Sequence, residues 1–186
     1  MDIMPDSEQA YFLALQNNDE NAFEALFTKH YSNLVRFVRV MIPGSGEEAR
    51  DIVADVFEYL WISRHKIVLK GSLKAYLYTC VRNKTIDYAR RHRIEPVSLR
   101  DRFDDMPLSS GYTPEKELLY KETNSHIAYL IDSLPPQTKI IFRMNRDEGL
   151  TYHEIAAILH ISVNTVKTHM FRGLKSLKEA FVAFSR

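Results

Sequence analysis

Apolar residues recur at helical spacing through the first half of the chain. Over residues 20–42 they fall three or four positions apart, so they share one face of a predicted helix. That stripe consists of Phe23, Leu26, Phe27, Tyr31, Leu34, Val35, Val38, Met41 and Ile42. The run Pro43-Gly44-Ser45-Gly46 predicts the end of the helix. A shorter helix near residues 7–17 is expected to pack on it.

Two more helices follow in the same half. Ser45 and Glu48 have capping-box spacing, which predicts the start of a helix over about residues 47–61. Its inward positions are Ala49, Ile52, Val53, Val56, Phe57, Leu60 and Trp61. Lys70-Gly71-Ser72 then breaks the chain, and Ser72 is expected to cap a helix that reaches about Arg91. Residues 1–93 are therefore predicted to form an all-helical domain.

The periodicity disappears over residues 94–113, which are rich in proline, serine, glycine and acidic residues. We expect a flexible linker there. Residues 114–186 then predict a second, four-helix domain. It begins at Pro114 with a helix to about Asp132, breaks at Pro135-Pro136, and continues as a helix over Gln137–Asn145. The predicted fold is thus all-α, with two small helical domains.

The last two helices of the second domain read as a helix-turn-helix. Thr151 and Glu154 predict a capping box, and the helix after them has an apolar face made of Ile155, Ala156, Ile158 and Leu159. His160 and Ile161 form the turn, and Ser162 is expected to cap the second helix. The apolar stripe of that helix is Val163, Val166, Met170, Leu174 and Leu177.

The opposite stripe of the second helix is basic and able to form hydrogen bonds. It consists of Lys167, Thr168, Phe171, Arg172 and Lys175. No acidic residue occurs between Glu154 and Glu179, whereas four lysines and arginines do. Helix pairs of this kind also occur in bundles that never touch DNA. Surface helices usually mix charges to gain ion pairs, however, so the absence of acids favours DNA binding.

Charge is segregated along the chain although the net charge is only +1. Residues 82–93 carry five lysines and arginines against one aspartate, and residues 47–58 carry five acids against Arg50. Segregated charge produces local fields that a net count hides. Three of the acids, Asp51, Asp55 and Glu58, fall on one edge of the predicted helix. Alone, that edge reads as an ordinary solvated face, with protein docking as the alternative.

The predicted helix over residues 72–91 interleaves tyrosines with basic side chains. This combination suits unpaired nucleic acid, because rings stack on bases while cations hold the backbone. An equally favoured reading is that the tyrosines cover the bundle with their hydroxyls in water. The chain has a single cysteine, an acidic and polar beginning and no apolar run of membrane-spanning length, so we expect a cytoplasmic protein without membrane insertion.

No catalytic or metal-binding pattern emerges from the sequence. The seven histidines lack metal-ligand spacing, there is no glycine-rich phosphate loop, and Cys80 sits on an apolar helix face. We therefore expect neither an enzyme nor a cofactor. A helix-turn-helix regulator, whose N-terminal bundle senses a ligand or dimerises, is one alternative for the function of this chain.

The order of these features resembles the extracytoplasmic-function (ECF) group of bacterial sigma factors. The family's polymerase-docking segment resembles the stretch ARDIVADVFEYLW, and its promoter-melting helix resembles SLKAYLYTCVRNKTIDYARR. The domain that reads the −35 element resembles LTYHEIAAILHISVNTVKTHMFRGLKSL. Some positions depart from the usual pattern. Ala54 replaces a common glutamine, Tyr76 a tryptophan, His160 a glycine and Gly173 an alanine.

The resemblance implies a sigma factor that binds core RNA polymerase through its β and β′ subunits and opens promoters. It also implies an anti-sigma factor as a partner and no cofactor. Binding to double-stranded −35 DNA is expected for Asn164, Thr165, Lys167, Thr168, Phe171, Arg172 and Lys175. Binding to the single-stranded −10 element is expected for Lys70, Ser72, Tyr76, Tyr78, Arg82, Asn83, Lys84, Arg90 and Arg91. Polymerase docking is expected for Asp51, Asp55 and Glu58.

Overall fold

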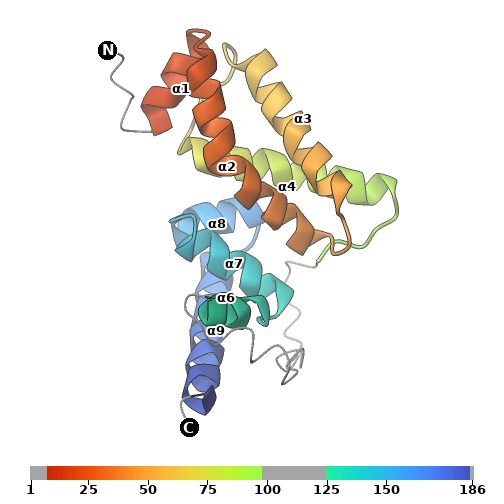
Figure 1. Cartoon of the computed structure of the whole chain (residues 1–186), viewed down its shortest axis with the longest axis vertical. Coiled ribbons are helices and arrows are strands. Elements are labelled where there is room, and N and C mark those ends of the chain that lie inside the picture. Colours follow the sequence, from red (N-terminus) through yellow and green to blue (C-terminus); the bar gives the residue numbers. More distant parts are fainter. Residues whose placement is uncertain (1–7, 98–124, 185–186) are drawn as a thin grey trace. The chain divides into compact units, whose positions relative to one another are not determined.

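The computed structural model describes residues 8–97 and 125–184, and all regular structure in these ranges is α-helical. This confirms the predicted all-α class. The chain divides into two compact units, Met1–Pro96 and Val97–Arg186, whose helices are labelled in Figure 1. Most of the predicted linker over residues 94–113, and the predicted helix start at Pro114, lie outside the described residues.

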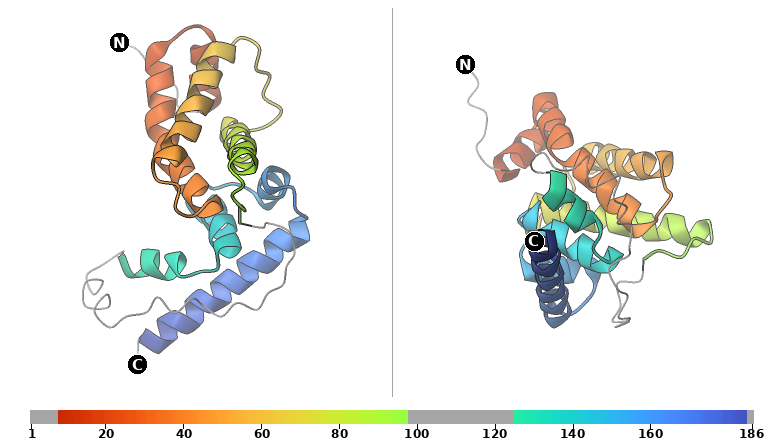
Figure 2. Two further views of the ribbon diagram at one scale, coloured as in Figure 1. Left: turned by 90° about the vertical axis from the view of Figure 1, so that its right-hand side faces the viewer. Right: turned by 60° about the horizontal axis from the view of Figure 1, so that its bottom comes forward.

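The first unit contains four described helices: α1 (Glu8–Gln16), α2 (Glu20–Met41), α3 (Glu47–Ser63) and α4 (Leu73–Arg91). The long helix α2 packs against each of the other three, and α3 packs against α4 (Figure 2). The predicted stripes of α2 and α3 supply the core. Its completely enclosed side chains include Leu15, Leu26, Leu34, Met41, Phe57, Leu60 and Leu77.

Polar caps fix where these helices begin. The Asp19 side chain accepts hydrogen bonds from the backbone of Asn21 and Ala22 at the start of α2. Ser72 caps α4 as predicted, since its hydroxyl accepts a bond from the backbone N–H of Ala75 at 3.2 Å. These bonds satisfy amide groups that a helix leaves without an intrahelical partner.

The predicted capping box of Ser45 and Glu48 is wrong. The N-cap of α3 is Gly46, and no side chain bonds to its first turn. Ser45 instead lies in the turn that ends α2, where its hydroxyl donates to the carbonyl of Ile42 at 2.7 Å. Since the Ser45 hydroxyl is engaged at the end of the preceding helix, α3 starts one residue later than a serine cap would place it.

Two polar contacts tie the short helix α1 to the rest of the first unit. The amide of Gln16 donates to the backbone carbonyls of Arg64 and Ile67, at 2.9 and 3.1 Å. The Arg64 guanidinium also lies 4.2 Å from the centre of the Trp61 ring. Together these contacts close the end of the bundle where α1 and α3 both terminate.

The second unit contains α6 (Ser125–Asp132), α7 (Pro136–Arg146), α8 (Tyr152–Leu159) and α9 (Val163–Phe184). The long helix α9 packs against the other three. Pro136 occupies the first turn of α7, where its missing N–H removes no helical hydrogen bond. Buried apolar residues between these helices include Leu134, Ile141, Met144, Ile155, Ile158, Val166 and Met170.

Leu174 does not belong to the buried stripe predicted for α9, because 45% of it is exposed. Gly173, the preceding residue, faces α7 in its place, where an added Cβ atom would meet Thr138 and Phe142. Successive residues of a helix point about 100° apart, so placing Gly173 inward turns Leu174 outward. The prediction assumed that the larger apolar residue would take the inward position.

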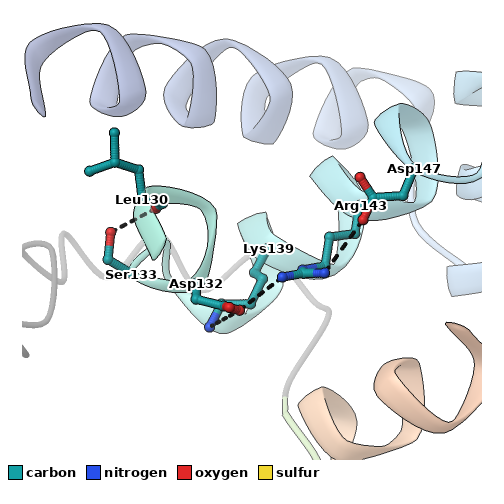
Figure 3. Close-up of polar contacts among 6 residues, drawn as sticks. All are labelled: Leu130, Asp132, Ser133, Lys139, Arg143 and Asp147. Carbon is teal, nitrogen blue, oxygen red and sulfur yellow. Dashed lines mark hydrogen bonds and ion pairs between the residues drawn. The ribbon is translucent and has the colours of Figure 1, made fainter. Parts of the chain in front are cut away.

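An ionic cluster joins the end of α6 to α7 (Figure 3). The Asp132 carboxylate lies 3.0 Å from the Arg143 guanidinium and 3.7 Å from the Lys139 ammonium, and Arg143 also lies 3.4 Å from Asp147. Both cationic side chains are mostly buried, and burial lowers the pKa of Lys139. The cluster compensates their charges and holds α6 on the helix that supports α9.

Candidate nucleic-acid interface

The helix-turn-helix forms through the predicted caps. The Thr151 hydroxyl accepts from the backbone of Glu154, and the Glu154 carboxylate accepts from the backbone of Thr151, which completes the capping box. Ser162 caps α9, since its hydroxyl accepts from the Thr165 N–H at 2.9 Å. His160 closes α8 in the left-handed conformation, with φ 56°. A sharp, hydrogen-bonded turn therefore sets the direction of α9.

The basic stripe of α9 lies on the surface of the second unit. Lys167, Arg172 and Lys175 are exposed, and Phe171 between them is 69% exposed. The Thr168 hydroxyl donates a hydrogen bond to the backbone carbonyl of Asn164, at 3.0 Å. Asn164 is itself exposed. An exposed aromatic ring flanked by cations offers an apolar contact for base edges together with charges for phosphates.

Thr165 does not join this surface. Only 7% of the residue is exposed, and its hydroxyl lies 2.7 Å from that of Ser162 at the helix cap. Thr165 therefore stabilises the start of α9 and is not available to DNA. Of the two contacts predicted in the first turn of α9, Asn164 is the exposed one.

The outer face of α4 carries a second basic surface. Asn83, Arg90 and Arg91 are exposed, and Lys84 is half-buried. An open groove is lined by Lys84, Asp87, Arg90 and Arg91. Asp87, which was not predicted to take part, pairs with Arg90 at 3.4 Å. Its position three residues from both Lys84 and Arg90 was the signal that places it on this face.

An aromatic stack lies at the end of α4. The rings of Tyr88 and His92 are stacked, with centroids 4.2 Å apart and planes tilted by 26°. Neither residue is among the predicted −10 contacts, although Tyr88 is one of the tyrosines that the helix over residues 72–91 interleaves with basic side chains. Their spacing of four residues, next to Arg91, was the available signal, because such pairs meet on one helix face.

Tyr78 is not available for the predicted −10 contact, since only 3% of it is exposed. Its ring packs edge-on against Phe37 of α2, with centroids 5.1 Å apart. Because α4 packs against α1, α2 and α3, its buried face is wide enough to take both Leu77 and Tyr78. The sequence pattern predicted a narrower buried face for α4, with Tyr78 outside it.

The other predicted −10 residues differ in what they offer. Lys70 is exposed, whereas the Ser72 hydroxyl is engaged as the cap of α4. Tyr76 is partly buried, and burial together with its Cys80 neighbour raises the pKa of its phenol far above the usual range. Burial also lowers the pKa of Arg82, whose guanidinium donates to the Asn83 side chain at 3.3 Å.

The predicted docking residues Asp51, Asp55 and Glu58 are all exposed on α3. The Asp55 carboxylate lies 2.8 Å from the Lys84 ammonium of α4, so the acidic edge adjoins the basic surface. Ile62, four residues after Glu58, is 67% exposed and extends the edge with an apolar side chain. Ile62 is not among the predicted docking residues, and its spacing of four residues from Glu58 was the signal that places it on this edge.

Within residues 8–97 and 125–184 no three histidine, cysteine or acidic side chains are grouped so that they could hold a metal ion. None of the helices in these ranges is long and apolar enough to cross a membrane.

Two family models match the chain. The sigma-70 region 2 model matches residues 26–94, and the model for sigma-70 region 4 matches residues 127–177. These segments contain all three surfaces described above. The chain belongs to the ECF group of sigma factors. As an ECF sigma factor it is a transcription initiation factor for RNA polymerase. Residues 8–25, which include α1, precede both matched segments.

Three curated relatives are sigma factors by name. The ECF RNA polymerase sigma factor SigE of Mycolicibacterium smegmatis is 25% identical over 161 residues, which are 85% of this chain but 61% of that protein. The ferric citrate uptake sigma factor FecI of Escherichia coli is 26% identical, over 82% of this chain and 87% of its own. The ECF sigma-E factor of Escherichia coli is 24% identical over 92% of both chains.

Solved structures share the fold. CnrH in complex with the cytosolic domain of CnrY has a TM-score of 0.57 and 19% identity, covering 96% of this chain and 99% of its own. The sigma factor RpoE in complex with the anti-sigma factor NepR, from Bartonella quintana, has a TM-score of 0.54 and 19% identity, covering 84% of this chain and 94% of its own.

Proposed function

We propose that this ECF sigma factor uses three separate surfaces to bind core RNA polymerase, to choose promoters and to open them. The exposed stripe of α9 carries the proposal, because cations flank an outward-facing aromatic ring there. The chain performs no covalent chemistry in this scheme and is not an enzyme. It acts in the cytoplasm, where the polymerase and the promoters are.

In the recognition step, α9 enters the major groove of the −35 element. Arg172 and Lys167 donate to guanine edges, and Phe171 meets a thymine methyl group. Asn164 and Lys175 contact phosphates, which fix the orientation of the helix without reading sequence. The absence of acidic side chains between Glu154 and Glu179 keeps repulsion of the phosphates low.

The opening step assigns the outer face of α4 to the non-template strand of the melted −10 element. Asn83 and Lys84 contact a base that has left the helix stack, and Arg90 and Arg91 hold phosphates. Extruding a base costs a few kcal/mol, so stacking and hydrogen bonds must offset that cost. Tyr78 has no role in this step because it is buried.

The docking step assigns the acidic edge of α3 to a basic surface of the β′ subunit, with contacts to β completing the complex. Complementary charge speeds encounter and fixes orientation. Asp55 already pairs with Lys84, at 2.8 Å, so docking at Asp55 and strand binding at Lys84 each compete with this ion pair. We infer that the pair opens when polymerase and the melted strand are both bound.

An anti-sigma factor is a further proposed partner. CnrH and RpoE share this fold, and their structures were solved with the cytosolic domain of CnrY and with the anti-sigma factor NepR. The exposed apolar residues Tyr59 and Ile62 on α3 fit a partner that covers the docking edge and keeps polymerase away.

Co-purification with core polymerase tests the proposal against the rival of a ligand-sensing helix-turn-helix regulator. The tagged full chain is mixed with sigma-free core enzyme and resolved by size-exclusion chromatography. A stoichiometric complex with core enzyme is expected. A chain that elutes alone, but still binds duplex DNA, would support the regulator and overturn the sigma-factor assignment.

A further inference from the structure

Thr138, on α7, contacts two successive turns of α9 at once. Its Oγ1 atom lies 3.0 Å from Nδ1 of His169. Its methyl carbon Cγ2 would lie 3.0 Å from a Cβ atom at Gly173, which is four residues further along α9. Thr138 is itself only 5% exposed, so the surrounding core holds it in place. One side chain thus makes a polar contact with α9 and limits the size of the residue that α9 can carry one turn further on.

Gly173 allows this close approach. A Cβ there would lie unusually close to the Thr138 methyl carbon and at ordinary contact distance, 3.4 Å, from Phe142 of α7, so a glycine lets α9 pack on α7 without either neighbour moving. Glycine weakens a helix interior relative to alanine, and its presence mid-helix has a packing reason here. Gly173 therefore allows α9 to pack closely on α7 beside Thr138.

The proposed DNA-reading residues lie on the same two turns of α9. Thr168 and Arg172 immediately precede His169 and Gly173 in the chain. A rotation of α9 by about 20° about its own axis would move a side-chain group that lies ~6 Å from the axis by ~2 Å. Hydrogen-bond lengths tolerate only about 0.5 Å of variation, so such a rotation would change which base edges Arg172 reaches.

We infer that Thr138 is a positioning residue that fixes the rotation of α9 on α7, and thereby which bases of the −35 element are read. This rests on the proposed function of α9 in DNA reading. Its hydroxyl sets the rotation through His169, and its methyl sets the closest approach through Gly173. Thr138 acts through the recognition residues and does not itself contact DNA.

The hydroxyl is tested by Thr138→Val, which keeps the size and the methyl carbon of the side chain. The full chain is first used to select a preferred sequence from random duplex DNA, and binding is then measured to single-base variants of that sequence. For Thr138→Val we expect about fivefold weaker binding to the preferred sequence and altered base preference beside Arg172. Binding to unrelated duplex DNA should change by less than about twofold, because phosphate contacts carry it.

Asn145→Ala is the matched control. It removes a hydrogen bond within the same unit, from the Asn145 amide to the carbonyl of Leu150 at 2.9 Å, that does not involve α9. A purely structural loss of this kind lowers the unfolding temperature but leaves the base preferences of the folded protein unchanged. The comparison therefore separates positioning from stability.

Gly173→Ala is the second variant. It is expected to fold, because alanine strengthens a helix interior, so it tests the inference even if Thr138→Val fails to fold. The added methyl pushes α9 away from Thr138, so a shift in base preference is expected here too. Wild-type base preferences in both Thr138→Val and Gly173→Ala would overturn the inference. A wild-type chain that selects no duplex sequence at all would overturn the proposed −35 function, and the inference with it.

Discussion

At the residue scale, single positions show which local rules the sequence reveals and which it hides. The cap residues Ser72, Thr151 and Ser162 could be predicted, because a hydroxyl just before an apolar period has one favourable use. Tyr78 and Thr165 could not be placed, because their burial depends on how widely neighbouring helices cover them. The ion pair of Asp55 with Lys84 likewise requires the packing of α3 on α4.

His160 adopts a conformation that favours glycine. Its φ of 56° lies in the left-handed region, which costs a residue with a Cβ atom about 1 kcal/mol relative to glycine. His160→Gly should therefore raise the free energy of unfolding by about 1 kcal/mol, measured by urea denaturation. His153→Gly, within α8, is the control and should lower it. A destabilised His160→Gly would show that the imidazole makes a contact worth more than the strain.

His30 makes the stability of the first unit depend on pH. Burial lowers its pKa from 6.5 to about 4, although Glu8, 3.5 Å away, acts in the opposite direction. The unfolded chain therefore binds more protons between these values, so stability is full above pH 6.5 and falls as the pH drops towards 4. Between pH 7.5 and pH 5 we expect a loss of about 2 kcal/mol from this residue.

The check is urea denaturation of His30→Gln at both pH values, with His65→Gln as an exposed control. His30→Gln should lose less stability on acidification than the wild type, and His65→Gln should lose the same amount as the wild type. Equal losses in all three proteins would mean that other groups set the pH dependence.

Arg172 is predicted to read one base. Arg172→Ala should weaken binding to the preferred −35 duplex by about 1–3 kcal/mol and relax specificity at one position. Lys167→Ala is the comparison on the same stripe. The measurement is fluorescence anisotropy with a set of single-base variants. If Arg172→Ala weakens binding to all sequences equally, Arg172 contacts phosphate and not a base.

At the element scale, the helices were predictable where a long apolar stripe or a cap residue marks them. The stripe of α2 and the caps of α8 and α9 led directly to the observed elements. The errors arose at single positions whose role depends on the neighbouring helix. Ser45 belongs to the end of α2 and not to α3, and Gly173 takes the inward place assigned to Leu174. Sequence periodicity reports the direction of burial but not the partner or the distance of approach.

The acidic edge of α3 should anchor the chain on polymerase. Because exposed ion pairs contribute only about 0–1 kcal/mol each, one charge reversal can pass unnoticed. Asp51→Lys combined with Asp55→Lys should weaken binding to core polymerase at least about tenfold at physiological salt, measured by competition binding. Circular dichroism confirms the fold, and −35 DNA binding should persist.

The matched control reverses two exposed acids on α2, as Glu20→Lys with Glu24→Lys. It changes the net charge by the same amount but leaves α3 intact, so core affinity should stay near the wild-type value. Equal losses in both double variants would mean that overall charge, and not the α3 edge, governs docking.

At the scale of the whole molecule, the proposed function is divided between two units with separate cores. The proposed docking edge and −10 surface lie on the first unit, and the proposed −35 surface lies on the second. Because one chain joins them, binding through one unit raises the effective concentration of the other at the same promoter. We expect this division to let a chain of net charge +1 bind both a basic protein surface and DNA.

Run-off transcription with sigma-free core polymerase tests the central claim most directly. With genomic promoter fragments as templates, adding the chain should produce discrete transcripts that core enzyme alone does not make. Permanganate should then detect unpaired thymines near the start sites, and the Asn83→Ala, Lys84→Ala variant should open the promoters less. The account would be contradicted by a chain that binds core polymerase yet yields no promoter-specific transcript on any template.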